Sequence, residues 1–586
     1  MASSPVSPSR LKLDIQSFDQ VIALSQAHIN QTLKYNFTFT NQKLLKFDKE
    51  FNGTSLYGDL KPPSIGIIRS DQEEQALLFL DFKNGEFIWT EIELVVGENG
   101  RKRSKSTDKD IPATGWRLAF LVKFSLQEVE NSELPDQVAA VTSDLGKPGD
   151  YSISRLILDF GNAKHLSLEW EQCLTPGLEG EARDKMKPHI EIFTRGFLSD
   201  LTKVDEDNPE KFNANILGYA VKVDSTPKVL EQANKNAPHL SPTALRLQTM
   251  VAKGETPNPS GDLNAILFTE MTEGRPLPKD RLPWTGDLFY QSIGGTLAVA
   301  KSNFWDKFIK PKLQVVNKDN MDLMNEAAWL FCDQSRFSSD KAGPTSHVWV
   351  VQPKDKGSFE TVDLTFNKES GTRWHEDFEN MTVRNESFLG GRLEDKWTCT
   401  SYCRNDVEPI SGTGRIVMES DVYINSVRQV SGYTASLPFV GELPLAIAFI
   451  YATTRMRWTT TLTLRSIETG GGLEVEVSVK RSDPENTFQT VTHGAFDDVP
   501  FLKSFTEDLK ASLKDASDKI PGLLSRYLDA FVAAQNTAEQ LSKALNGQSR
   551  FIFPGGGTFD MKDPIFSTNK DVLIGLSYRQ GKAKSA

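Results

Sequence analysis

The stretch from Leu523 to Tyr578 decides the fold class that we predict for this chain. It begins as LLSRYLDAFVAAQNTAEQLSKALNG over residues 523–547 and continues as FIFPGGGTF over residues 551–559. Asn546-Gly547 supplies the left-handed residue that commonly ends a helix. We therefore predict one long amphipathic helix and then a strand from Phe551, with the triple glycine as a turn because no lysine follows it to reach a phosphate. The apolar side chains recur every three or four residues, the spacing of one helix face: Leu524, Leu528, Phe531, Ala534, Ala538, Leu541 and Leu545.

Composition limits the classes of protein to consider. A chain of 586 residues is too long for one ordinary core, and we expect two large domains. With 38% hydrophobic and 25% charged residues, the chain resembles folded soluble proteins. Its net charge of −11 argues against nucleic acid as a partner, because nucleic-acid binders are normally basic. Residues 1–10 lack the apolar run of a secretory signal, so we expect a cytoplasmic protein, with export by an unconventional route as the alternative. No apolar run is long enough for a transmembrane segment.

Signals for strands and turns dominate the first half. Ser17-x-x-Gln20 has the form of a capping box and predicts a first helix that carries Phe18 and Ile29 on one face. Asn84-Gly85 predicts a tight hairpin between strands over residues 76–82 and 87–95.

The following segments are more polar. Residues 98–110 contain a basic cluster that we predict to be a solvated loop. Residues 207–280 are rich in proline, and we expect loops and edge strands there, with a short helix over 244–252. A bulky apolar face containing Phe304 and Phe308 then predicts a middle helix, which Pro311 shortens or kinks. Further on, Met456–Leu464 and Leu473–Val479 alternate as two strands should.

No catalytic or metal-binding motif stands out. The sequence has no nucleophile elbow, no zinc-binding His-Glu-x-x-His and no phosphate loop. The seven histidines are scattered without metal-ligand spacing. The polar segment around His375 and Glu376 would be the first place to look for a catalytic site, although such charged clusters usually lie on a solvated surface. We expect no cofactor, no metal and no catalytic residue.

Three segments resemble the tubular lipid-binding (TULIP) superfamily. They are residues 18–30, the segment GGTLAV at residues 294–299, and the ending from Phe551 to Tyr578. The branch that the chain is most similar to is the forty-seven-kilodalton protein of clostridial neurotoxin gene clusters with its microbial and fungal relatives. The resemblance implies an α+β fold of two tubular domains, each a highly curved antiparallel β-sheet wrapped around a long α-helix. It implies no catalytic residues.

On this basis we divide the chain into a disordered leader at residues 1–12, a first tubular domain at 13–318, a second at 319–580 with long C-terminal helices, and a tail at 581–586. The expected function is non-enzymatic binding of a lipid or another hydrophobic ligand in an apolar tube. The candidate ligand-binding residues are apolar side chains of the predicted helices and strands: Leu524, Leu528, Phe531, Trp458, Leu462, Phe304 and Phe308. The candidate headgroup contacts are basic: Arg101, Lys102, Arg103 and Lys310.

Two other functions fit the same sequence. The fold could serve as a protein-interaction scaffold, as in a toxin-accessory or assembly protein, or it could hold a cofactor-free enzyme such as a cyclase acting on an apolar metabolite. Peripheral contact with a membrane is compatible with all three.

Overall fold

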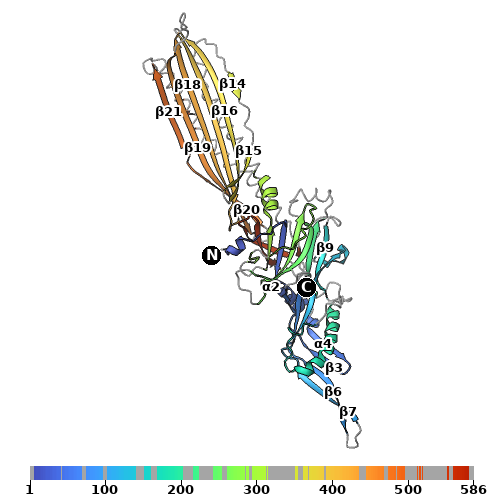
Figure 1. Ribbon diagram of the computed structural model, residues 1–586. Coiled ribbons are helices and arrows are strands. Elements are labelled where there is room, and N and C mark those ends of the chain that lie inside the picture. The colour runs from blue at the N-terminus through green and yellow to red at the C-terminus, as the bar shows by residue number, and fades with distance from the viewer. Residues whose placement is uncertain are drawn as a thin grey trace.

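In a computed structural model the chain is elongated, with a long curled sheet at one end and a narrow two-stranded ribbon at the other (Figure 1). The structure describes residues 6–40, 42–68, 74–96, 102–136, 138–139, 151–159, 168–201, 215–223, 242–253, 260–283, 286–289, 294–311, 313, 350–353, 360–366, 369–388, 391–434, 444–466, 473–483, 485–494, 511, 514–515, 518, 551–552 and 558–579.

Antiparallel sheets form most of the described chain. The long sheet curls into a half-barrel and contains β14 (Val350–Pro353), β15 (Glu360–Phe366), β16 (Glu369–Phe388), β17 (Gly391–Pro409), β18 (Arg415–Thr434), β19 (Pro444–Ser466), β20 (Leu473–Arg481) and β21 (Glu485–Gly494). A second sheet has the order β22 (Phe551–Ile552), β10 (Ile216–Val223), β9 (Tyr151–Asp159), β8 (Arg117–Val129), β5 (Gln75–Asp81) and β4 (Ser64–Ile67). A smaller sheet consists of β2 (Lys46–Phe51), β3 (Thr54–Asp59), β6 (Glu86–Val96) and β7 (Lys102–Pro112).

Few helices accompany these sheets in the described residues. The α-helices are α1 (Pro8–Leu11), α2 (Gln26–Tyr35) and α4 (Gly180–Leu201). The π-helices are η1 (Asn36–Thr40) and η6 (Ser302–Ile309), and the 3-10 helices are η2 (Gln42–Leu45) and η3 (Asn131–Glu133). The antiparallel part of the predicted fold is thus confirmed, whereas the wrapping of each domain around a long helix stays a prediction.

A central sheet brings together three distant parts of the chain. Its order is β11 (Pro242–Met250), β12 (Ala265–Thr272), β1 (Gln20–Ser25), β13 (Gly295–Val299), β24 (Val572–Arg579) and β23 (Thr558–Phe566). The predicted strand near Phe551 is present as β22, and the chain then forms β23 and β24 beside the strands from its beginning and middle. The helix predicted over residues 523–547 lies outside the described residues.

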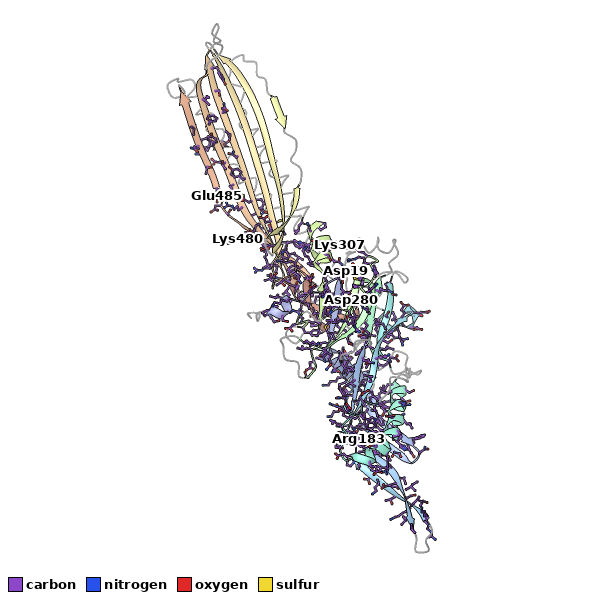
Figure 2. All side chains as sticks on the ribbon, viewed as in Figure 1. Asp19, Arg183, Asp280, Lys307, Lys480 and Glu485 are labelled. Carbon is purple, nitrogen blue, oxygen red and sulfur yellow. The ribbon has the colours of Figure 1, made fainter. Side chains whose placement is uncertain are left out.

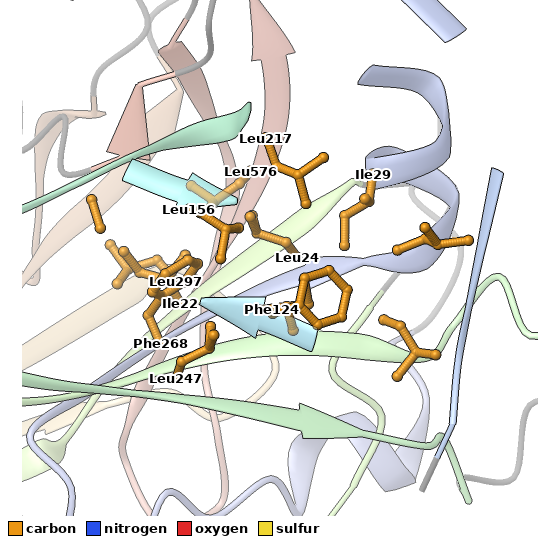
Figure 3. Packing of buried hydrophobic residues seen from close by; sticks show 14 of the residues in the cluster. Ile22, Leu24, Ile29, Phe124, Leu156, Leu217, Leu247, Phe268, Leu297 and Leu576 are labelled. Atoms are coloured by element: carbon orange, nitrogen blue, oxygen red, sulfur yellow. The ribbon is translucent and has the colours of Figure 1, made fainter. Parts of the chain in front are cut away.

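One large core joins this central sheet to the second sheet. Apolar side chains from β1, β8, β9, β12, β13 and β24 pack together in it, with α2 at one side (Figure 3). Apolar side chains of β8 and β9 are buried there, among them Phe124 and Leu156. They are core residues, as most buried apolar residues are.

The first predicted helix is wrong in its position. Gln20–Ser25 is a strand with β12 and β13 on its two edges, and all six of its residues are buried because apolar clusters cover both of its faces. A central strand reads as a continuous apolar run, which short helical spacings can imitate. The helix starts instead at Gln26, where the Ser25 side-chain oxygen accepts a hydrogen bond from the His28 backbone N–H at 3.2 Å.

The hairpin predicted at Asn84-Gly85 is also wrong. Strand β5 pairs with β4 and β8, whereas β6 pairs with β3 and β7. The Asn84 side chain explains this path, because its Oδ1 accepts a hydrogen bond from Asp59 N at 3.0 Å and its Nδ2 donates to Asp59 Oδ2 at 2.9 Å. Gly85 has φ of 144°, and a Cβ there would lie 2.3 Å from the Tyr57 carbonyl oxygen. The pair therefore forms a corner between two sheets.

Two further segments differ from their predicted form. The short helix predicted over residues 244–252 is strand β11, which pairs with β12 at the edge of the central sheet. The loop predicted over residues 98–110 is mostly strand β7, although its side chains are exposed as expected. The middle helix is confirmed as η6, with Phe304 and Phe308 buried.

Candidate ligand-binding face of the long sheet

Strand β19 separates two kinds of side chain cleanly along its length. From residue 447 to residue 465 its even-numbered residues are buried and its odd-numbered residues are half-buried or exposed, as the period of two in a strand requires. The predicted ligand-binding residues Trp458 and Leu462 lie on the buried face. The buried residues are Ala448, Ile450, Ala452, Thr454, Met456, Trp458, Thr460, Leu462 and Leu464.

The neighbouring strands extend this buried face. In the antiparallel register Trp458 pairs with Ser420 of β18, and Leu462 pairs with Ile416. On the other side, Leu462 pairs with Val477 of β20. The alternating sequence predicted that β19 and β20 are neighbouring strands with a shared apolar face. The structure confirms that they pair. We call this surface the inner face; its described members outside β19 are Val407, Ile416, Met418, Ser420, Val475, Val477 and Val479.

The opposite face of the same strands is polar. Arg455 donates to Asp421 Oδ1 at 2.9 Å, and Arg457 donates to Glu485 Oε1 at 3.2 Å. Figure 2 shows Glu485 and Lys480 along the edge of the long sheet, toward its junction with the rest of the molecule. Because charged pairs occupy one face and apolar residues the other, the sheet is amphipathic across its thickness.

Two polar atoms on the inner face lack a hydrogen-bond partner among the described residues. They are Trp458 Nε1 and Thr460 Oγ1, which are two positions apart on β19 and therefore on the same face. Each residue is only 2% exposed. A buried donor or hydroxyl without a partner costs about 1–3 kcal/mol, so each is a strong candidate for contact with a polar atom of a ligand.

The other predicted ligand-binding residues are described only in part. Phe304 and Phe308 are 6.0 Å apart between ring centres, and Phe304 also contacts Phe566. They lie on η6 and belong to the same large apolar cluster as Trp458 and Leu462 of β19. Leu524, Leu528 and Phe531 lie outside the described residues, so their contact with a ligand stays a prediction.

The predicted basic headgroup contacts lie in different parts of the molecule. Lys102 and Arg103 lie on β7, at the end of the molecule opposite the long sheet (Figure 1). Lys310 directly follows η6, after the central strand β13. Arg101 lies outside the described residues. One phosphate therefore cannot contact both groups.

A buried polar cluster that sequence reasoning missed lies where β1, β12 and η6 meet. Asp19 Oδ2 accepts hydrogen bonds from Thr272 N at 2.8 Å and from Thr272 Oγ1 at 2.9 Å. Arg275 forms an ion pair with Asp19, and Asn303 Nδ2 donates to Thr272 Oγ1 at 3.0 Å. The carboxylate is satisfied on both oxygens, so this cluster holds the fold together and offers no free general base.

Burial shifts the pKa values of a histidine and an aspartate in opposite directions. Burial lowers the pKa of His28 from 6.5 to about 4 and raises the pKa of Asp571 from 3.8 to about 6. His28 packs its ring against Phe559, and Asp571 accepts a hydrogen bond from Lys301 N at 2.8 Å. His28 lies on α2, whereas Asp571 directly precedes β24.

Neither a metal site nor a membrane-crossing helix is found in what the structure describes. No three His, Cys, Asp or Glu side chains of the described ranges are grouped so that they could hold a metal ion. Within the same ranges, no helix is both long and apolar enough to cross a bilayer. His375 and Glu376 lie on β16, and their side chains are outside the described set.

Comparison with known proteins gives structural neighbours only. No protein-family model matches the chain, and no curated protein matches its sequence. Similar solved structures include P47 from Clostridium botulinum A2, which is 10% identical with a TM-score of 0.40 over 97% of this chain and 99% of that chain. P47 of Clostridium botulinum E1 is 11% identical with a TM-score of 0.39 over 96% and 100%. A lipopolysaccharide binding protein is 10% identical with a TM-score of 0.28 over 97% and 100%.

The two P47 structures are of the branch that the three sequence segments were predicted to resemble. We base the functional proposal on this chain's own residues.

Proposed function

We propose that this chain binds a lipid or another amphipathic molecule against the inner face of the long sheet. The observation that carries the proposal is the pair Trp458 Nε1 and Thr460 Oγ1, unpartnered among the described residues and set in an otherwise apolar surface. The apolar residues on both sides would contact the hydrocarbon part of the ligand. The indole N–H would donate to an oxygen of its polar part, and the Thr460 hydroxyl could donate or accept.

The energetics favour a ligand that has both a hydrocarbon part and a polar part. Burial of each methylene contributes about 0.8 kcal/mol before ordering costs are subtracted. One hydrogen bond to Trp458 or Thr460 would add about 1 kcal/mol and would fix the position of the ligand along the strand. An alkane would leave both polar atoms without a partner, so we expect a fatty acid or a lysophospholipid to bind more tightly than a pure hydrocarbon.

The direct test is identification of what the purified protein carries. Native mass spectrometry of the full chain, followed by extraction into organic solvent, should reveal a bound molecule with an acyl or other long apolar group. If the protein is empty as purified and also fails to bind a fluorescent fatty acid and a fluorescent lysophospholipid, the proposal is wrong.

Threonines on opposite faces of β19 allow a matched mutational test. Thr460→Val removes the buried hydroxyl at nearly constant volume, whereas Thr459→Val makes the same change on the outer face. We expect Thr460→Val to weaken fluorescent fatty-acid binding about fivefold to tenfold, the equivalent of one hydrogen bond. The delipidated variant should be as stable as the wild type or more stable by about 1 kcal/mol, because a buried unpaired hydroxyl is removed.

Thr459→Val should leave both affinity and stability within error of the wild type. Equal affinity for all three proteins would show that the hydroxyl contacts no ligand and would contradict the placement of the polar group.

A further inference from the structure

A two-stranded ribbon projects from the end of the molecule opposite the long sheet (Figure 1). Strands β6 and β7 pair along their whole lengths, from Glu86 with Pro112 to Val96 with Lys102. Strand β3 pairs with β6 only as far as Ile88. Beyond Ile88 the ribbon therefore has no third strand in the described part of the sheet.

This ribbon carries an unusual concentration of exposed apolar side chains. Ile92, Leu94 and Val96 are 67%, 70% and 62% exposed, and Val95 is 43% exposed. They are four of the nine large apolar side chains that are exposed among the described residues. Contiguous exposed apolar surface of this kind commonly marks an interaction site.

The alternation of the strand gives the two faces of the ribbon different chemistry. Ile92, Leu94 and Val96 share one face, where the residues opposite them on β7 are Ser106, Ser104 and Lys102. We call this the apolar ribbon face. The small serines leave the three apolar side chains uncovered.

The other ribbon face is charged. Val95 pairs with Arg103 and Glu93 pairs with Lys105 across the strands, and Lys109 lies 3.8 Å from Glu91. The described strand ends, residues 92–96 and 102–106, carry the basic residues Lys102, Arg103 and Lys105 and the acidic residue Glu93, in a chain whose net charge is −11. The described end of the ribbon is therefore locally basic, with Lys102 on the apolar ribbon face and Arg103 and Lys105 on the other face.

We propose that the end of this ribbon docks on an anionic lipid surface. Ile92, Leu94 and Val96 would enter the boundary between headgroups and acyl chains, and Lys102 and Arg103 would contact anionic headgroups beside them. Basic side chains beside a narrow apolar stripe match the chemistry of that boundary. A two-stranded ribbon end also presents little surface compared with the roughly 800 Å² per partner of a stable protein interface.

Docking of the ribbon is independent of ligand binding by the inner face, because the two sites lie at opposite ends of the molecule. The lipid class is defined by its negative headgroup charge and its packing in a bilayer. A ligand held on the long sheet is a single molecule removed from a bilayer, so the two sites can be tested separately.

Vesicle flotation of the full chain tests the proposal. We expect the protein to float with vesicles of equimolar phosphatidylcholine and phosphatidylglycerol and to float much less with phosphatidylcholine alone. Raising the salt concentration should weaken the association, because screening acts on exposed charges. A wild-type protein that floats with neither vesicle would overturn the proposal.

Substitutions of the apolar and of the basic side chains separate their two contributions. The double variant Ile92→Ser/Leu94→Ser should bind the anionic vesicles at least tenfold more weakly at every salt concentration. The double variant Lys102→Gln/Arg103→Gln should also bind about tenfold more weakly in low salt, and its binding should depend less on salt than that of the wild type.

Leu174→Ser provides the control. Leu174 is also a large apolar side chain that is well exposed, at 57%, and it lies outside the ribbon. Its vesicle binding should equal that of the wild type; an equal loss in this variant would refute the assignment to the ribbon. Size analysis provides the second check. If the wild type is a dimer that Ile92→Ser/Leu94→Ser converts to a monomer, the ribbon is an interface between copies and the lipid assignment is wrong.

Thr460→Val should float as the wild type does. Normal flotation together with an empty inner face would disprove the proposed function alone, whereas ligand binding without flotation would disprove only the ribbon assignment.

Discussion

Replacement of Asp19 by alanine is expected to lower the free energy of unfolding by about 3–5 kcal/mol. The change leaves the backbone N–H and the hydroxyl of Thr272 without their acceptor, and it leaves Arg275 without its ion-pair partner. Asp19 is only 2% exposed, so water cannot easily replace the lost carboxylate. Urea unfolding at neutral pH, followed by far-ultraviolet circular dichroism, measures the change.

Two variants show whether the loss comes from this cluster. Asp19→Asn keeps an oxygen that can accept from Thr272 but lacks the charge, so its loss should lie between those of the wild type and the alanine variant. Glu181→Ala removes an ion pair with Lys185 in which both side chains are exposed, and stability should stay within error of the wild type. If Asp19→Ala changed the stability as little as Glu181→Ala does, the buried cluster would contribute little to stability.

Asp19 also shows why part of the fold could not be read from the sequence. The segment around it has apolar residues at helical spacings, and we predicted a helix starting at Ser17. The chain instead forms β1, because β12 and β13 pair with its two edges and separate apolar clusters bury its two faces. Partners more than 200 residues away decide between helix and strand there, and a single sequence does not specify them.

The long sheet was easier to predict. Alternation between Met456 and Leu464 and between Leu473 and Val479 follows directly from a sheet with one buried face, and both strands are present with the expected residues facing inward. What alternation cannot show is whether Trp458 Nε1 has a partner. That depends on the groups that approach the sheet from other elements.

The ribbon was harder to predict than the long sheet. Its basic segment was noticed in the sequence, but as a loop, and the apolar residues before it were predicted as one strand of the hairpin at Asn84-Gly85. In the structure Ile92 and Leu94 lie beyond the end of the pairing with β3, which local pattern does not reveal. The candidate membrane contact could therefore be placed only once the strand pairing was known.

The pKa shift of His28 predicts a loss of stability in acid. Above pH 6.5 the ring is neutral in both folded and unfolded chains, so this group gives no dependence on pH. As the pH falls from 6.5 toward about 4, the unfolded chain binds a proton that the folded chain does not, and stability falls by roughly 3 kcal/mol. His28→Phe keeps a ring against Phe559 and removes the titration. Its stability relative to the wild type should therefore rise by about that amount between pH 7 and pH 4.

The pKa of Asp571 is shifted in the opposite direction. In the wild type it offsets part of the stability loss that His28 causes in acid. Its folded-state pKa of about 6 exceeds the unfolded value of 3.8, so the stability associated with this group is highest in acid and falls as the pH rises through that interval. Asp571→Asn keeps an oxygen for Lys301 N and should be more stable than the wild type at pH 7, by roughly 2–3 kcal/mol more than at pH 4. Urea unfolding of the wild type and both variants at a series of pH values measures the two differences. Because the groups titrate in opposite directions, the wild type should show a flatter acid profile than Asp571→Asn, and a wild-type profile as steep as that of Asp571→Asn would contradict the assigned burial of the carboxyl group.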